Sequence, residues 1–325
     1  MPELLPPASP RRHLLSIGDV ARDDVERILD TASSLSVSLE REVKRLPTLR
    51  GRTVVHLFYE ASTRTLSSFE LAAKRLSADV MSLRSAGSSV DKGESLRDTA
   101  TTLAAYDPDV LVVRHAAAGA AAFVAECVEA HVVNAGDGKH QHPTQALLDL
   151  YTIRHALGRL EGVHVAIVGD VLHSRVARSL VQALGLVGAE TTLVGPPTLL
   201  PRDLASALRC EASTSIEAIG SADVVYVLRM QRERMLSGEA LVPSLREYSA
   251  LYGITPERVR PGQVVMHPGP MNRGVEIDAR VADSGAALVA QQVRSGLVVR
   301  MAVLYDLLTV PTAAPVVERE HAGMT

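Results

Sequence analysis

The chain has 325 residues, of which 46% are hydrophobic and 22% are charged. That length exceeds the usual size of one hydrophobic core, so we expect two domains of roughly 150 residues each. The composition is that of a globular protein, and the formal net charge of -3 offers no broad basic field for binding nucleic acid.

The two ends of the chain differ in composition from the rest. Met1 to Pro10 is rich in proline and carries Glu3, and two arginines follow it. A secretory signal begins with positive charge and continues into an apolar run, so this segment does not fit one. No stretch approaches the ~20 apolar residues of a membrane span. We therefore expect a cytoplasmic protein with loose tails at residues 1–12 and 312–325.

Short runs of Val, Ile and Leu without polar alternation recur between longer helical patterns. This rhythm predicts an α/β fold in which mostly parallel strands lie under helices on both faces. The strands predicted in the first half are 53–59, 80–83, 110–114 and 132–135, and the helices are 66–75, 95–105, 120–130 and 143–157. The strands predicted in the second half are 164–168, 191–194, 224–228 and 264–266.

A domain boundary is predicted after the fourth helix of the first half. That helix keeps apolar residues at helical spacing, and the segment 159–162 breaks the pattern before a new strand begins. We assign residues 13–157 to the first domain and 158–287 to the second. A final apolar helix, 288–308, is long enough to cross back and pack on the first domain, so residues 288–310 are assigned there.

The first predicted strand leads into three hydroxyl side chains and one guanidinium at the start of a helix, namely Ser62, Thr63, Arg64 and Thr65. The free N–H groups and the positive dipole end of a helix N-terminus attract anions, and arginine can hold phosphate with two hydrogen bonds. A single Ser or Thr here would be a simple N-cap. An arginine flanked by hydroxyls favours a phosphate site.

Two further strands of the first half also end in polar residues, where open parallel sheets bind their ligands. Arg114 ends the third strand and can clamp the same anion, or form a surface salt bridge. His142 and Gln145 follow the fourth strand and lie one helical turn apart, with Pro143 suited to that first turn. A neutral imidazole can donate to a carbonyl oxygen and a Gln amide oxygen can hold an NH₂ group. A lone histidine is more often a cap or a surface residue.

The strands of the second half end in similar groups. Arg175 follows the first of them, and Arg229 and Gln231 alternate after the strand 224–228, so both can project into one cleft. Two arginines so placed suit a ligand with two carboxylates. The last strand ends in His267-Pro268-Gly269-Pro270, a rigid turn whose backbone carbonyls can point at a ligand.

The small-residue loop 85–94 is expected to be mobile. Its Lys92 can close over an anionic substrate or remain a solvated loop lysine. Cys127 and Cys210 show no CxxC or Cys/His spacing, so neither a zinc site nor a disulfide is indicated. Neither a dinucleotide-binding GxGxxG, a Walker A sequence nor a metal-ligand cluster is found, and we expect no cofactor.

Five motifs together resemble the aspartate carbamoyltransferase family in order and spacing, across about residues 13–310. They are Phe58-Tyr59-Glu60-Ala61-Ser62-Thr63-Arg64-Thr65, Val113-Arg114-His115, His142-Pro143-Thr144-Gln145, Leu228-Arg229-Met230-Gln231 and His267-Pro268-Gly269-Pro270. Any one of these motifs alone would be unspecific. Five in one order are highly specific.

The resemblance implies roles for the matched positions. The residues implied to bind carbamoyl phosphate are Ser62, Thr63, Arg64, Thr65, Arg114, His142, Gln145, Pro268, Gly269 and Pro270. Among them Thr65, Arg114 and His142 would polarise the carbonyl group. Gln145 and the carbonyls of Pro268 and Gly269 would hold the carbamoyl amino group.

The resemblance also implies the second substrate and the assembly. Arg175, Arg229 and Gln231 would bind the carboxylates of L-aspartate, with Lys92 also reaching them. Ser88 and Lys92 would come from the neighbouring subunit, which implies a homotrimer with shared active sites. The aspartate amine would attack the carbamoyl carbon through a tetrahedral oxyanion and phosphate would leave, a reaction of pyrimidine biosynthesis.

Two alternatives remain at this point. Ornithine carbamoyltransferase shares the first domain but usually shows His-Pro-Cys-Gln, a His-Cys-Leu-Pro turn and an Asp-containing Ser-Met-Gly loop. The matching positions here read His142-Pro143-Thr144-Gln145 and His267-Pro268-Gly269-Pro270, and Arg229 with Gln231 favours a second carboxylate. A non-catalytic scaffold in a pyrimidine-synthesis assembly would be expected to lose site residues, and every matched position is occupied. Association with regulatory chains or a dihydroorotase stays open.

Overall fold

The computed structural model describes residues 13–84, 93–231, 242 and 244–309. Within these residues the strands form two sheets in which every neighbouring pair is parallel. The first sheet has the order β2-β1-β3-β4 and contains β1 (Thr53–Phe58), β2 (Asp79–Arg84), β3 (Val110–His115) and β4 (His131–Asp137). The second has the order β7-β6-β5-β8-β9 and contains β5 (His164–Val168), β6 (Glu190–Val194), β7 (Glu211–Ser213), β8 (Val224–Val227) and β9 (Val264–Met266).

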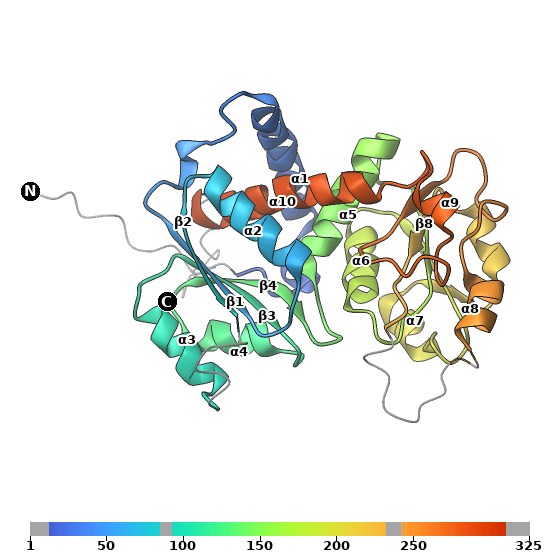
Figure 1. The fold of residues 1–325 in the computed structure, drawn as a ribbon, viewed down its shortest axis with the longest axis horizontal. Coiled ribbons are helices and arrows are strands. Elements are labelled where there is room, and N and C mark those ends of the chain that lie inside the picture. The colour runs from blue at the N-terminus through green and yellow to red at the C-terminus, as the bar shows by residue number, and fades with distance from the viewer. Residues whose placement is uncertain (1–12, 85–92, 232–241, 243, 310–325) are drawn as a thin grey trace, which may run out of the picture.

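Helices cover both faces of each sheet (Figure 1). They are α1 (Arg22–Ser36), α2 (Thr63–Arg75), α3 (Leu96–Ala104), α4 (Ala120–Cys127), α5 (Pro143–Leu157), α6 (Arg175–Leu186), α7 (Arg202–Leu208), α8 (Leu245–Tyr252), α9 (Ala279–Ala282) and α10 (Val289–Thr309). Short 3-10 helices span Ile17–Asp19, Val37–Glu40, Pro47–Leu49 and Ile216–Ser221. The fold class expected from the sequence is therefore confirmed.

Strand alternation divides the core of the first sheet. Val54 and Val110 face the layer of α1, α2, α5 and α10, while Val55 and Leu111 face α3 and α4. All four side chains are fully buried. Because both faces are covered, these strands read as continuous apolar runs without polar alternation.

The last helix, α10, packs back on the first domain as expected. It contacts α1, α2 and α5 along its length, and its beginning reaches β9 of the second sheet. Figure 1 shows it lying over the first sheet's half of the molecule and reaching the junction with the second beside α5. Unlike an amphipathic surface helix, it also buries polar residues, among them Gln292 and Arg300.

Some elements differ from those predicted. The helix predicted at 120–130 ends at Cys127, because Val128 adopts an extended backbone and packs its buried side chain into the core beside α3 and α4. The strand β7 was not predicted; it has only three residues, and two of them are exposed. Among the described residues, no helix combines the length and apolar character that crossing a lipid bilayer requires.

Both sheets contain a point at which the strand order reverses. In the first sheet the chain leaves β1 toward β2 on one side and leaves β3 toward β4 on the other; β5 and β8 play the same part in the second. The loops after such a pair diverge and leave a crevice at the carboxyl ends of the strands, the usual ligand site of open α/β sheets. The crevices are bordered by Ser62 to Thr65 and Arg114 in one sheet, and by Arg175 and Arg229 in the other.

Candidate active site

The start of α2 presents polar groups that the helix does not use for itself. Ser62 is the N-cap residue and has an extended backbone, but its hydroxyl makes no capping hydrogen bond. Thr63 and Arg64 are exposed, and Thr65 is buried. Ser62 thus occupies the N-cap position without using its hydroxyl to cap the helix, and the first-turn N–H groups and these side chains are placed to receive an anion.

One carboxylate, that of Glu60, bridges two guanidinium groups from separate domains. Arg114 Nη2 donates to Glu60 Oε1 at 2.8 Å, and Arg175 donates to both oxygens of Glu60, at 2.6 and 3.0 Å. Arg114 lies at the end of β3 and Arg175 at the start of α6. Both arginines are buried, so Arg114 is not part of a surface salt bridge.

A glycine near the end of β4 makes room for these two arginines. Gly136 has a φ of +115°, and a Cβ added there would lie 2.7 Å from Nη1 of Arg114 and 3.1 Å from Cζ of Arg175. Arg114 Nη1 also donates to the Ala135 carbonyl at 2.9 Å, and Arg175 Nη1 to the Gly138 carbonyl at 3.2 Å. Two guanidiniums and the Glu60 carboxylate are thereby held close together with a net positive charge, an arrangement that favours binding of anions.

His142 is the N-cap residue of α5 and is almost completely buried. Its backbone N–H donates to Ser179 Oγ at 2.8 Å, and its Nδ1 has no hydrogen-bond partner within the described residues. Burial, followed by the positive charges of Arg114 and Arg175, lowers the pKa of His142 well below its usual value. The imidazole is therefore neutral at physiological pH and can donate one hydrogen bond to a ligand.

Gln145 lies one turn further along α5. Its Nε2 donates to the two carboxylate oxygens of Asp149 at 3.1 and 3.2 Å. Because the two heteroatoms of an amide diverge, Oε1 points away from Asp149 and remains an acceptor for another group.

The turn after β9 brings the second domain against the start of α2. Gly269 has a φ of +68°, and a Cβ added there would lie 2.9 Å from Cζ of Arg64. His267 Nδ1 accepts a hydrogen bond from the Gly269 N–H at 2.9 Å. Burial lowers the pKa of His267 most, the hydrogen bond and charge of Glu276 oppose this, and the charges of Arg64 and Arg229 lower it further.

Gln231 is held by a buried pair after β5. Its backbone N–H donates to Asp170 Oδ2 at 3.2 Å and its Nε2 donates to the His173 carbonyl at 3.2 Å. His173 Nδ1 lies 2.8 Å from Asp170 Oδ1. This pair links the two strand ends that carry Arg175 and Arg229.

The predicted residues thus fall into contacts that join both domains, with some exceptions. Ser88 and Lys92 lie outside the described residues. Pro268 and Gly269 are half-buried beside Arg64, while Pro270 is exposed. No cluster of three or more potential metal ligands occurs in the part of the chain that the structure describes.

Three residues near the site were not identified from the sequence. Glu60 was named only as part of a motif, because nothing in the nearby sequence indicates that its carboxylate meets two distant arginines. Asp149 and Arg300 are buried polar residues whose surroundings depend on α10. Gln292 and Arg300 stand eight positions apart in an otherwise apolar helix. That spacing places them near one face, which would have indicated a buried polar face.

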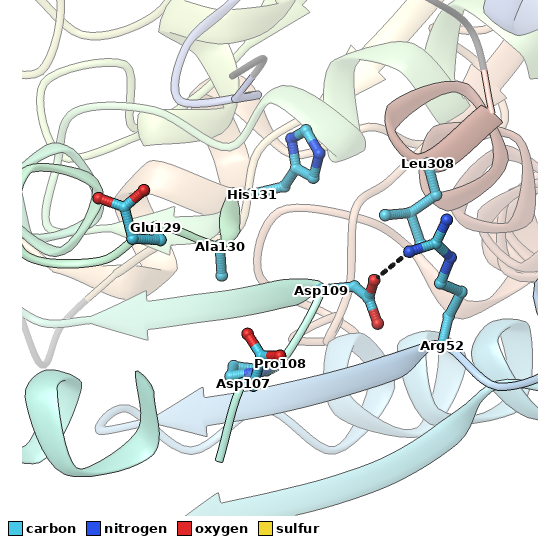
Figure 2. Close-up of a pocket in the computed structure, with 8 residues that line it drawn as sticks. All are labelled: Arg52, Asp107, Pro108, Asp109, Glu129, Ala130, His131 and Leu308. Atoms are coloured by element: carbon cyan, nitrogen blue, oxygen red, sulfur yellow. Dashed lines mark hydrogen bonds and ion pairs between the residues drawn. The ribbon is translucent and has the colours of Figure 1, made fainter. Parts of the chain in front are cut away.

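A separate hollow of about 250 Å³ lies at the amino ends of the first sheet's strands (Figure 2). Arg52 and Asp109 form an ion pair of 2.7 Å there, and Asp107, Glu129 and His131 also line it. The acidic groups outnumber the single arginine, and this is the end of a parallel sheet that usually binds no ligand. The carboxyl ends are therefore the better candidate for binding anions.

Comparisons with known proteins agree with this geometry. Residues 12–155 match the family model described as "Aspartate/ornithine carbamoyltransferase, carbamoyl-P binding domain", and residues 161–307 match the corresponding "Asp/Orn binding domain". The "Aspartate carbamoyltransferase catalytic subunit" of Thermobifida fusca is 58% identical over 91% of this chain and 95% of that protein. The protein of the same name from Moorella thermoacetica is 53% identical over 92% of this chain and 97% of its own.

Solved structures are similar over the same length. Aspartate transcarbamoylase from Trypanosoma cruzi, in complex with carbamoyl phosphate and aspartate, is 32% identical with a TM-score of 0.83, covering 92% of this chain and 99% of that one. The catalytic subunit of aspartate transcarbamoylase from M. jannaschii is 39% identical with a TM-score of 0.80, covering 91% and 97%.

Proposed function

The chain belongs to the aspartate/ornithine carbamoyltransferase family, and we infer that it is an aspartate carbamoyltransferase. It transfers the carbamoyl group of carbamoyl phosphate to the amine of L-aspartate, giving N-carbamoyl-L-aspartate and phosphate. The observation that carries this conclusion is the convergence of Arg114 and Arg175, from two domains, on the carboxylate of Glu60. A cleft built this way suits two anionic substrates.

The start of α2 binds the phosphate of carbamoyl phosphate in this proposal. Ser62, Thr63, Arg64 and Thr65 offer hydroxyls, N–H groups and a guanidinium, and Arg114 adds a second guanidinium. The positive end of the helix dipole and charge-assisted hydrogen bonds support this assignment. Arg64 is exposed and free to meet a ligand on its open side.

The carbamoyl group is bound between α5 and the turn after β9. Neutral His142, with Thr65 and Arg114, donates to the carbonyl oxygen, where negative charge develops when the amine attacks. Gln145 Oε1 and the carbonyls of Pro268 and Gly269, in the turn that ends at Pro270, accept from the amino group. Preorganised donors at a developing oxyanion typically contribute factors of about 10²–10³ to turnover.

L-Aspartate lies on the second domain's side of the cleft. Arg175, Arg229 and Gln231 bind its two carboxylates, and Lys92 joins them. The proposal rests on the two arginines at the strand ends of the second sheet and on the names of the relatives. A cationic acceptor such as ornithine finds no matching carboxylate among these residues.

The reaction needs no covalent enzyme intermediate. The aspartate nitrogen forms a bond to the carbamoyl carbon, the bond from that carbon to the phosphate oxygen breaks, and phosphate leaves with a proton from the amine. The residues act by orienting two substrates and stabilising the oxyanion.

We further propose that the enzyme acts in the cytoplasm, in pyrimidine biosynthesis, as a homotrimer. Ser88 and Lys92 of a neighbouring subunit complete each site in this arrangement. Sedimentation analysis of the purified chain tests it, with a trimer expected. Mixing Lys92→Ala chains with an inactive Arg64→Ala variant is expected to restore activity if sites are shared.

A colorimetric assay of N-carbamoyl-L-aspartate tests the phosphate site directly. The Arg64→Ala variant is expected to lose most activity because it removes one guanidinium of the anion site. Arg50→Ala, which alters an exposed arginine outside the cleft, is the matched control and is expected to keep wild-type activity. Equal activity of both variants would contradict the assignment.

A further inference from the structure

The buried carboxylate of Asp149 lies where three structural elements meet. It has no exposed surface, and it accepts hydrogen bonds from Gln145 of α5, from Tyr226 of β8 and from Gln292 of α10. Tyr226 OH donates to Oδ2 at 2.7 Å, and Gln292 Nε2 donates to Oδ1 at 2.8 Å. Helices α5 and α10 lie side by side here (Figure 1).

The first of these hydrogen bonds fixes the polarity of the Gln145 amide. Its Nε2 lies within hydrogen-bond distance of both Asp149 oxygens. At a pH above 7 the Asp149 carboxyl is mostly ionised, and an ionised carboxylate can only accept. The amide therefore cannot turn over without placing its oxygen against another oxygen. As a result, Gln145 keeps its acceptor directed away from Asp149.

The Gln292 amide is fixed in the same way and extends the network to the turn after β9. Its Nε2 donates to Asp149, and its Oε1 accepts from the His267 backbone N–H at 2.9 Å. His267 in turn accepts from the Gly269 N–H through Nδ1. One carboxylate thus anchors both Gln145 and the start of the turn that carries the Pro268 and Gly269 carbonyls.

We propose that Asp149 is a positioning residue that makes the carbamoyl subsite a pure acceptor site, and so selects an acyl phosphate bearing NH₂ over one bearing CH₃. The inference rests on the proposed function, because it takes Gln145 and the turn carbonyls as the groups that meet the amino group. Asp149 itself does not touch the substrate.

The cost of burying Asp149 supports a role beyond packing. Burial raises its pKa to about 7, although the hydrogen bonds from Tyr226, Gln292 and Gln145 and the charge of Arg300 oppose the rise. A buried carboxyl is expensive unless it is well paired. An Asn at this position would leave a single neutral oxygen to accept from both Gln145 and Gln292, with its NH₂ group turned toward the Tyr226 hydroxyl, so both amides would be held less firmly.

The test compares two ligands that differ only in that group. Binding of carbamoyl phosphate and of acetyl phosphate, which has a methyl in place of the amino group, is measured by competition kinetics, with inorganic phosphate as reference. In Asp149→Asn the preference for carbamoyl over acetyl phosphate is expected to fall about tenfold, the size of one lost hydrogen bond. The affinity for inorganic phosphate is expected to stay at the wild-type value.

Two further variants separate positioning from folding. Asp306→Asn changes a second buried carboxylate, which lies on α10 outside the cleft and accepts from Arg27 Nε at 2.7 Å. This variant is expected to keep the preference for carbamoyl phosphate. Gln292→Met removes the hydrogen bonds to both Asp149 and the His267 backbone N–H but leaves Asp149 and Gln145 in place. It is expected to lower the preference, so the test stands even if Asp149→Asn does not fold. In the double variant Asp149→Asn with Gln145→Glu, the carboxylate stands at position 145, where it can accept from both the NH₂ group of the new asparagine and the amino group of the ligand. This variant is expected to regain part of the preference for carbamoyl phosphate.

The outcomes are distinguishable. An unchanged preference in both Asp149→Asn and Gln292→Met would overturn the inference while leaving the proposed function intact. An equal loss of affinity for all three ligands would overturn it too, because it would show a general structural effect. A wild-type protein that neither binds nor consumes carbamoyl phosphate would refute the proposed function itself.

Discussion

The guanidinium of Arg175, at the start of α6, donates two hydrogen bonds to the carboxylate of Glu60 after β1, at 2.6 and 3.0 Å. Glu60 follows a strand of the first sheet and Arg175 follows a strand of the second, so this contact links the two parts of the molecule. Glu60 also binds Arg114. Its position therefore determines how two cations are presented to the substrates.

Replacing Glu60 by Gln is expected to lower turnover at least tenfold, because the neutral amide holds two guanidiniums less firmly. The carboxylate is partly exposed, so the effect on stability is expected to be small. Steady-state kinetics and thermal unfolding measure the two effects. The control is Glu161→Gln, which alters an exposed partner of Arg22; a Glu60 variant as active as this control would show that the bridge does not matter.

Substituting Gly136 by Ala is expected to abolish most activity. The added Cβ would lie 2.7 Å from Arg114 Nη1, and the φ of +115° is strained for any side chain, at a typical cost of about 1–3 kcal/mol. Gly158→Ala is the matched control, since Gly158 also has a positive φ but nothing lies within 4 Å of its added Cβ. Both variants should lose stability in urea unfolding, and only Gly136→Ala should lose substrate affinity. If the two variants had similar Michaelis constants, the contacts of Gly136 with Arg114 and Arg175 would not explain the loss of activity.

Most residues of the candidate site could be predicted from the sequence, because the site lies at the carboxyl ends of the strands. The carboxyl ends of parallel strands gather at one edge, so Arg114, His142 and Arg175 could be named before any side chain was placed. Which polar residue of a loop turns inward depends on the packing of two domains, and the sequence contains no local signal for the Glu60 bridge.

Asp149 shows a different reason for failure. In the sequence it stands among Leu147, Leu150 and Tyr151, where a carboxylate on a helix is normally solvated. The structure buries α5 on nearly every side, because α10 returns from the end of the chain to cover it. Burial of a polar residue by so distant a segment cannot be inferred from helical periodicity.

His142 is expected to stay neutral across the working pH range. Its pKa lies well below the usual value, because of burial and of the nearby arginines. The unfolded chain takes up a proton near pH 6.5 and the folded chain does not, so this residue's contribution to stability is present above that pH and is lost as the pH falls. Unfolding in urea at pH 5.5 and 7.5 should show a smaller pH effect in His142→Gln than in the wild type. A His142 imidazole that titrates near pH 6.5 by NMR would contradict the assignment.

Gly269→Ala is expected to displace Arg64 and weaken binding of carbamoyl phosphate. An added Cβ would lie 2.9 Å from both Cζ and Nη1 of Arg64. Gly274 in the same segment has a similar positive φ and open space around its added Cβ, so Gly274→Ala controls for backbone strain. The Michaelis constant for carbamoyl phosphate should rise in the first variant and not in the second. An equal rise in both would place the effect in the backbone and not in Arg64.

The most direct test of the central claim is the choice of acceptor by the purified chain. Carbamoyl phosphate is supplied with either L-aspartate or L-ornithine, and the carbamoylated product is measured. The arginines at the strand ends of the second sheet predict that product forms with aspartate and not with ornithine. Product from ornithine alone would contradict the roles given to Arg175 and Arg229, and with them the identification of the second substrate.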